Sequence, residues 1–280
     1  MFSINPFAEL SALIPSAILQ GYIVLMFVLV VGGTILDMMH KKSAQYFFEN
    51  AEKAKKNAKR TLSGGEKAGL AVATVANEVL TSAEFKSARR RLSHLLTMYG
   101  FVIFVVTTVW LIFCHTAQDA SAAPTLLTGL WHIGAIMLCL GGYWFWFFIR
   151  VDVASEGNPW HRIVRADLFI LSLLASTTSA LLWSLFQGSG FLGGLFLLVF
   201  IISSTVLFCG VIWSKFAHMF FKPAAAFQKR VAQADGSLDN LPEPADRTNP
   251  ADRDRHSMEL LKDAPLNMGL GIKREQPHHY

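Results

Sequence analysis

Five long apolar runs constrain the fold of this chain more than any other sequence feature. They cover approximately Ile18–Leu36, Leu95–Cys114, Leu126–Ile149, Leu168–Phe186 and Leu192–Trp213. As helices, which rise about 1.5 Å per residue, all five are long enough to cross about 30 Å of hydrocarbon. None has the polar stripe of a soluble amphipathic helix. Charged residues make up only 16% of the 280 residues, against roughly a quarter in a soluble domain. The pattern predicts an all-α polytopic membrane protein with five transmembrane helices.

The basic residues lie in alternate connections between these runs. Segment 40–94 holds 12 of the 25 Lys and Arg residues, the connection after the third run holds 3, and segment 214–280 holds 10. Segments 1–36, 116–125 and 187–191 hold none. Lys and Arg near span ends stay on the cytoplasmic side, so the N-terminus is predicted outside and the C-terminus inside. The net charge of +5 therefore reports orientation, and no nucleic acid partner is indicated.

These boundaries give a simple organisation. Residues 1–17 are expected to be a periplasmic N-terminus and residues 18–37 the first transmembrane helix. Residues 38–92 form a long cytoplasmic helical loop rich in basic side chains. Residues 93–223 form the bundle of transmembrane helices two to five, and residues 224–280 form a polar, flexible cytoplasmic tail.

The loop and the tail each leave two interpretations open. Residues 43–60 combine aromatic side chains with lysines, which fits an interfacial helix on anionic lipid or a solvated charged helix. Residues 66–91 are expected to continue into the second span as one helix. The tail contains five prolines and few apolar side chains, so it is expected to stay extended or to order on a partner. Its apolar stretch 258–272 is either a docking segment or a frayed terminus.

Two kinds of residue in the spans have structural interpretations. Small polar residues and glycines in the fourth and fifth spans are expected to let helices pack closely, in preference to forming a polar pathway. Most tryptophans lie toward span ends, where amphipathic rings prefer the headgroup zone. These tryptophans are Trp110, Trp131, Trp144, Trp146, Trp183 and Trp213.

Histidine is the residue type that could carry chemistry. His94 opens the second span and His218 follows the fifth, so both are expected at the same depth on the cytoplasmic side. Two neutral imidazoles from facing helices can hold one haem b between them. His115 and His132 are matched in the same way at the outer face. The competing interpretation is that each of these is an ordinary interfacial histidine at a helix end.

Other cofactors have little support in the sequence. Cys114, Cys139 and Cys209 form no C-x-x-C pair, so neither a disulfide framework nor an iron–sulfur cluster is expected in this chain. Asp37 and Asp167 lie at the cytoplasmic ends of spans. Because ion paths use charges buried inside the membrane, proton-coupled transport by a small permease is the least favoured hypothesis.

Two stretches give the chain a family resemblance. They are residues 89–101 (RRRLSHLLTMYGF) and residues 213–223 (WSKFAHMFFKP). With five spans in this orientation, they resemble the nitrate reductase gamma subunit family, and also the membrane subunits of heterodisulfide reductase. Within that group the size and tail are similar to the adenylylsulfate reductase membrane anchor of sulfur-oxidising bacteria. The resemblance covers roughly residues 18–223.

The resemblance implies a function. Members pass electrons between membrane quinone and a cytoplasmic enzyme, usually through haem b on histidines of the second and last spans, which match His94 and His218 here. The last span carries no second histidine of the two-haem members, and the cysteines of the cluster-binding relatives are absent. We therefore expect a subunit of the bacterial inner membrane that binds adenylylsulfate reductase, with Asp37 and His40 near a quinone. The alternative is a haem-free scaffold that only recruits the enzyme.

Overall fold

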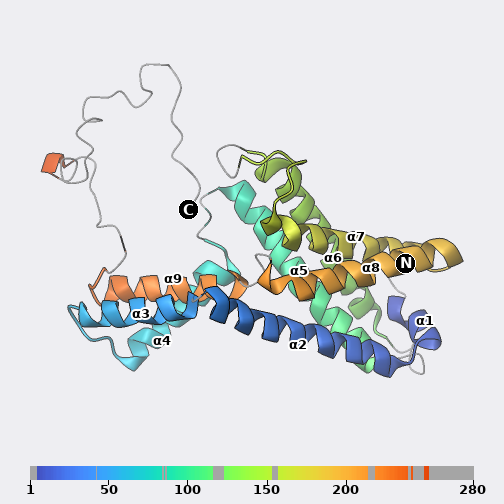
Figure 1. Ribbon diagram of the computed structural model, residues 1–280, viewed down its shortest axis with the longest axis horizontal. Coiled ribbons are helices and arrows are strands. Elements are labelled where there is room, and N and C mark those ends of the chain that lie inside the picture. The colour runs from blue at the N-terminus through green and yellow to red at the C-terminus, as the bar shows by residue number, and fades with distance from the viewer. Residues whose placement is uncertain are drawn as a thin grey trace, which may run out of the picture.

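The computed structural model describes residues 5–41, 43–83, 85, 87–115, 123–152, 157–213, 218–238, 241 and 249–251. Within these ranges every regular element is a helix (Figure 1). The α-helices are α1 (Pro6–Leu13), α2 (Ser16–Lys41), α3 (Ser43–Lys56), α4 (Gly64–Thr74), α5 (Ala88–Cys114), α6 (Thr125–Trp144), α7 (Leu168–Phe186), α8 (Gly190–Cys209) and α9 (His218–Ala234). Short π- or 3₁₀-helical segments are η1 (Val75–Leu80), η3 (Phe145–Ile149), η4 (Arg165–Asp167) and η5 (Gly210–Ile212).

Five helices are long and apolar enough to cross a membrane, which confirms the prediction of an all-α protein with five spans. They cover Ser16–His40, Ala88–Cys114, Thr125–Ile149, Arg165–Phe186 and Gly190–Ile212. These ranges contain the predicted apolar runs almost completely. The second helix begins at Ala88, seven residues before the apolar run that starts at Leu95. Its first turn therefore carries the three arginines that precede His94.

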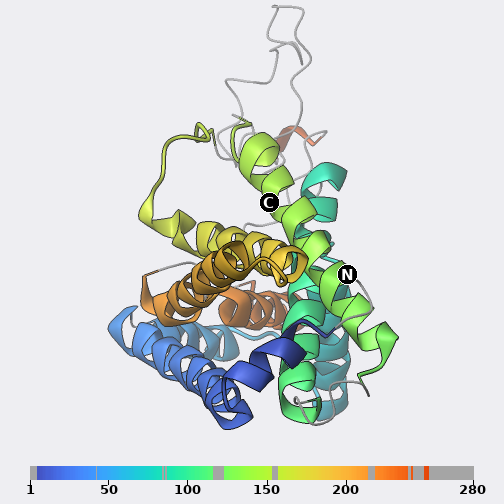
Figure 2. The ribbon, with the colours of Figure 1, turned by 90° about the vertical axis from the view of Figure 1, so that its right-hand side faces the viewer.

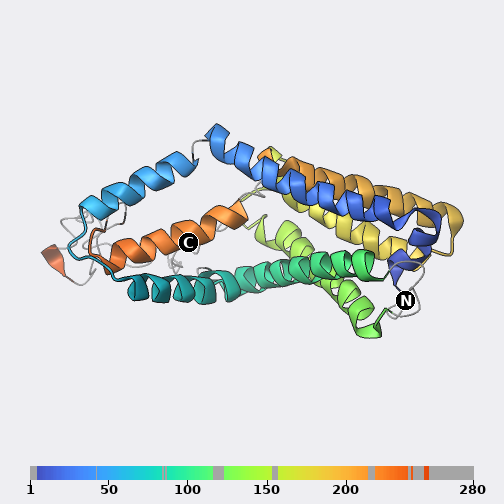
Figure 3. The same cartoon turned by 90° about the horizontal axis from the view of Figure 1, so that it is seen from below.

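The five spans form a closed ring. Helix α5 pairs with α6, α6 with α7, α7 with α8, α8 with α2, and α2 returns to α5 (Figure 2). Helices α3, α4 and α9 lie beyond one end of this ring, and we call that end the basic end (Figure 3). Helix α1 lies at the opposite end, where Phe7 packs against Trp131 and Trp183 with ring centroids 5.8 and 5.4 Å apart.

Glycines bring α5 and α6 into close contact. A Cβ atom on Gly100 would lie 2.8 Å from the backbone nitrogen of Leu138, and one on Gly134 would lie 2.8 Å from that of Phe104. Only glycine fits at such an approach. Next to the third close approach, at Gly141, the hydroxyl of Ser93 donates a hydrogen bond of 2.8 Å to the Gly141 carbonyl. Small residues at helix contacts are the usual means of close packing in a membrane.

The tryptophans predicted near the headgroup zone fall into an exposed group and a buried group. Trp110 and Trp213 are 54% and 55% exposed, as expected for side chains facing lipid or headgroups. Trp131, Trp146 and Trp183 are buried in the bundle, so their rings pack against protein. Trp131 is held there because its indole nitrogen donates to the Thr108 hydroxyl at 2.9 Å, which satisfies its polar atom.

Two predictions about the loop and tail are corrected. The helix expected over 66–91 is broken between Leu80 and Ala88, because the backbone turns at Ser82, which has a φ of 48° and is buried. Helix α9 extends to Ala234, so the first residues of the predicted flexible tail are helical. The apolar stretch 258–272 lies outside the described residues.

Candidate functional site

At the basic end, helices from two distant parts of the chain pack into one unit, which we call the α3–α4–α9 platform (residues 43–80 and 218–234). Arg230 of α9 and Glu78 of η1 form an ion pair of 2.8 Å. The side-chain amide of Gln228 donates to the carbonyl of Phe47 on α3 at 3.3 Å. Both α3 and α9 are amphipathic and contact each other, and Ala54 on α3 and Ala232 on α9 are buried.

The connection between α3 and α4 caps the end of α9. The backbone N–H groups of Lys59 and Arg60 donate to the carbonyl of Asp235 at 2.9 and 3.1 Å. The guanidinium of Arg60 donates to the carbonyl of Ala234 at 2.7 Å. Carbonyls at a helix end have no partner in their own helix, so this connection satisfies them and fixes α9 against α3 and α4.

The same connection starts α4 with a capping box. The backbone N–H of Glu66 donates to the Ser63 hydroxyl at 3.2 Å, and the N–H of Ser63 donates to the Glu66 carboxylate at 2.8 Å. The bond from the Ser63 backbone N–H is the main cause that holds the pKa of the Glu66 carboxyl below its ordinary value. The Ser63 side chain and the Arg60 guanidinium, which donates to the carboxylate at 2.9 Å, lower the pKa further. The carboxylate is therefore the form that stabilises this end of α4.

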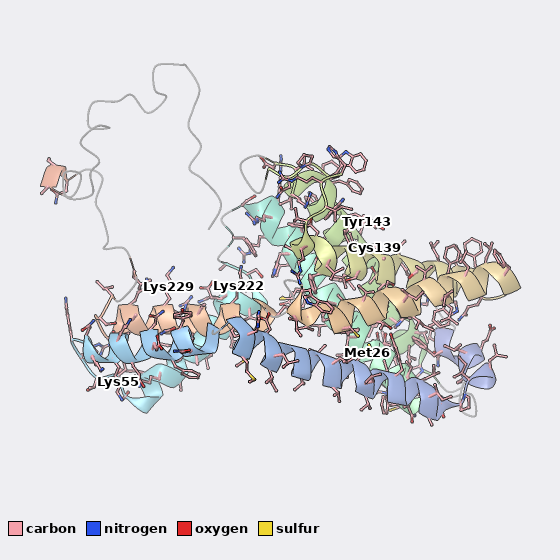
Figure 4. All side chains as sticks on the ribbon, viewed as in Figure 1. Met26, Lys55, Cys139, Tyr143, Lys222 and Lys229 are labelled. Atoms are coloured by element: carbon pink, nitrogen blue, oxygen red, sulfur yellow. The ribbon has the colours of Figure 1, made fainter. Side chains whose placement is uncertain are left out.

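The outer surface of the platform combines positive charge with exposed aromatic rings. Tyr46 and Phe48 are 59% and 64% exposed. Exposed lysines lie on α3 and α9, at positions Lys53, Lys55, Lys56, Lys222 and Lys229 (Figure 4). A surface of this kind suits an acidic protein partner or anionic headgroups.

His94 lies where the platform meets the bundle. Its Nδ1 atom is 3.0 Å from the Ser82 hydroxyl, and the Phe85 ring packs on its imidazole with centroids 5.0 Å apart. Phe85 also lies under the ammonium of Lys222, 5.3 Å from the ring centroid. The turn at Ser82, which sequence reasoning missed, therefore orients the imidazole.

The predicted haem pair is only half described. His218 begins α9, and its side chain lies outside the described residues. Lys222 is one helical turn further along α9, and the Phe85 ring fills the space between it and His94. The Phe85 ring is therefore the described neighbour of His94 on the side that faces α9.

The two weaker haem candidates have separate surroundings. His132 is fully buried in α6, with Nδ1 2.8 Å from the Thr128 carbonyl and Nε2 2.8 Å from the Ser184 hydroxyl. Both nitrogens are thus engaged: Nδ1 with the backbone of α6 itself, and Nε2 with Ser184 of α7. His115 ends α5, where its carbonyl accepts a hydrogen bond of 3.1 Å from Asn5, and its Nδ1 is buried without a hydrogen-bond partner among the described residues.

The two residues predicted near a quinone, Asp37 and His40, have different surroundings. Asp37 is only 2% exposed, on the part of α2 that packs against η5, whereas His40 is exposed one turn later. The two side chains therefore do not share one environment. In the part of the chain that the structure describes, no group of three or more His, Cys, Asp and Glu side chains could hold a metal ion.

A buried ion pair at the basic end was not predicted. Arg150 has no exposed surface and donates from Nε to the carboxylate of Asp167 at 3.3 Å. Its other nitrogens donate to the carbonyls of Asn158, Pro159 and Arg162, and the guanidinium lies 4.3 Å over the Trp146 ring. One side chain therefore ties together the described residues 158–167 of the connection between α6 and α7. The sequence signal was an arginine ending one apolar run and an aspartate opening the next.

An apolar cavity of about 210 Å³ lies between α2, α5, α7 and α8. A second apolar recess lies on the outside of α5 and α6, beside Cys139 and Tyr143 (Figure 4). Neither of these two linings includes a histidine. No family model, curated protein or solved structure matches this chain.

Proposed function

We propose that this chain is the membrane subunit of an oxidoreductase complex. It anchors adenylylsulfate reductase at the cytoplasmic face of a bacterial inner membrane and gives that enzyme access to the quinone pool. The partner carries out the sulfur chemistry, and this chain supplies the membrane-bound site. The partner and the quinone come from the sequence resemblance, whereas the anchoring role is also supported by the geometry at the basic end.

The platform is the observation that carries this proposal. Short connections between spans would be enough for a chain that only had to cross the membrane. Here the long loop and the segment after the last span are instead tied together by the Arg230–Glu78 ion pair and by the Arg60 cap on α9. The result is a rigid folded surface outside the spans, with exposed lysines and two exposed aromatic rings. Such a surface can hold a partner of opposite charge in one orientation.

A haem-free form of the same function is the second candidate. It is favoured by the Phe85 ring, which occupies the space between His94 and α9. In this form the chain recruits the enzyme and carries no electrons itself. A reduced-minus-oxidised optical spectrum of the purified chain separates the two forms. A b-type band lost in His94→Ala and His218→Ala supports haem transfer, and a colourless chain that still recruits the enzyme supports the haem-free form.

Recruitment is tested by flotation of vesicles that contain the full chain, mixed with purified adenylylsulfate reductase. The enzyme is expected to float with the vesicles, and less of it at high salt, because exposed charges are screened. The variant Lys55→Glu/Lys229→Glu, with one change on each of two platform helices, is expected to abolish flotation. Arg162→Glu/Arg165→Glu changes the charge equally in the connection between α6 and α7, and serves as the control. Absence of flotation with the unmodified chain would refute the proposal.

A further inference from the structure

The cavity between α2 and the other spans has walls that offer nothing polar to a ligand. The few hydroxyls near it bond to protein atoms: Ser176 with Ser204 at 2.7 Å, and Tyr22 with Thr205 at 2.9 Å. Thr108 donates to the carbonyl of Phe104 at 2.7 Å. The rest of the lining consists of aromatic and aliphatic side chains. Whatever fills this space must therefore be hydrocarbon.

The shape of the cavity is elongated along the spans. Its lining extends from Tyr22 to Val30 on α2 and from Phe101 to Val109 on α5. Eight residues of helix correspond to a rise of about 12 Å. An apolar cavity of about 150 Å³ already binds a molecule the size of benzene, so about 210 Å³ in a long, narrow form has room for part of a flexible chain.

The cavity is open to the membrane. Phe27 lines it and is 53% exposed, and it lies well inside the span Ser16–His40. The opening is therefore at the depth of the hydrocarbon. At the basic end the lining reaches Met219, which is 37% exposed, and Lys222 lies one helical turn further along α9. A molecule with its chain in the cavity could thus place a charged group near a lysine at the membrane surface.

We propose that this cavity is a binding site for one acyl chain of a phospholipid, whose phosphate lies at the start of α9 near Lys222. A phosphate is favoured over the uncharged ring of a quinone because Lys222, one helical turn beyond the lining residue Met219, is a cation. Inside the cavity no polar atom is placed to hold a quinone carbonyl. The bound lipid fills the space between α2 and α5 that side chains leave open. This inference does not depend on the proposed function.

Photochemical labelling tests the site in the full chain. The protein is reconstituted in vesicles of phosphatidylethanolamine and phosphatidylglycerol, with some phosphatidylglycerol carrying a diazirine on one acyl chain. After illumination we expect adducts on buried cavity residues such as Met26 and Leu207, in addition to those on lipid-facing side chains. Native mass spectrometry of the detergent-purified chain is expected to show one retained phospholipid.

Matched variants give the control. Val105→Trp and Met26→Trp fill the cavity from α5 and α2, whereas Val106→Trp and Leu25→Trp add the same side chain at neighbouring positions that are exposed and do not line it. The filling variants should retain at least about tenfold less phospholipid, since excluding two methylene groups already costs that much affinity. The control variants should retain it fully.

Three results would overturn the proposal. These are unchanged retention in both filling variants, a bound quinone in place of phospholipid, and adducts confined to lipid-facing residues of the unmodified chain. If a filling variant fails to fold, the labelling pattern of the unmodified chain still decides. Lipid loss with normal flotation of adenylylsulfate reductase would separate this site from the proposed function.

Discussion

The tightly packed unit α5–α8 and the loosely packed helix α2 differ although both are almost wholly apolar. In the most apolar stretch of α6, 44% of the residues are buried, against 6% for α2. Glycines bring α5 and α6 into backbone contact, and Ser176 bonds Ser204 between α7 and α8. Helix α2 has bulky side chains over Tyr22–Val30 and packs less closely against α5 than α6 does, which leaves the cavity. Hydrophobicity thus places a helix in the membrane, whereas small residues in register decide how closely it packs.

The largest effect on the free energy of unfolding is expected from Asp167→Ala, which changes the packed unit α5–α8 and leaves α2 unchanged. It leaves the buried Arg150 without its counter-charge, and breaking a buried pair in this way costs about 3–5 kcal/mol. The free energy of unfolding, measured by denaturant titration of the reconstituted chain, should fall by this amount. Arg165→Ala, on an exposed residue of the same connection, should change it by less than about 0.5 kcal/mol. Equal effects of the two variants would contradict the role given to Arg150.

A second prediction compares one glycine of the packed unit α5–α8 with one glycine of helix α2. Gly100→Ala should destabilise the chain by about 1–3 kcal/mol, because the new methyl group meets the backbone of α6. Gly21→Ala on α2 has nothing within 4 Å and should be neutral or stabilising by up to about 1 kcal/mol. The same titration measures both. A neutral Gly100→Ala would mean that α5 and α6 are not in contact as described.

Helix α2 does have one close contact, and neighbouring glycines test it. A Cβ atom on Gly33 would lie 2.9 Å from the Cβ of Val211, whereas one on Gly32 would meet nothing within 4 Å. We expect Gly33→Ala to cost about 1–3 kcal/mol, because the Cβ of the fully buried Val211 can move only with its backbone. Gly32→Ala should be harmless. If both variants behave alike, the contact of α2 with η5 is incorrect.

The smallest effect concerns the platform and leaves the spans unchanged. Because the folded protein lowers the pKa of Glu66, its capping box stabilises α4 fully above the unfolded pKa of about 4.3. That contribution is lost as the pH falls through the lower, folded value. The protection factors of the α4 amides, which are corrected for the intrinsic pH dependence of exchange, should therefore fall in this acid range in the unmodified chain. Glu66→Gln should remove the pH dependence, and its persistence in that variant would assign it to another group.

Composition and charge predicted the spans well because membrane insertion depends on summed transfer free energies. The five apolar runs gave the number and approximate bounds of the spans. The same signal could not find the cavity, since its volume depends on how Tyr22–Val30 meets α5 and not on the composition of either helix. The break at Ser82 was missed because that stretch has no glycine or proline to mark it.

The site residues show the same limit. In the sequence, Arg150 served only as one of the basic residues that predict orientation. Its pairing with Asp167 could not be predicted, because it depends on how the connection folds. His132 was grouped with His115 by depth, but hydrogen bonds to Thr128 and Ser184 engage both of its nitrogens. Depth along a span can be predicted from the sequence. The direction in which a side chain points around the helix could not be.

The central claim is that the α3–α4–α9 platform faces the cytosol, and cysteine accessibility tests it most directly. Cys114 is exposed at the opposite end of α5, and Lys229→Cys places a thiol on the exposed side of α9. In intact cells a membrane-impermeant maleimide should label Cys114 and leave position 229 unlabelled, and inside-out vesicles should reverse the pattern. Labelling of position 229 in intact cells, with Cys114 protected, would contradict the account.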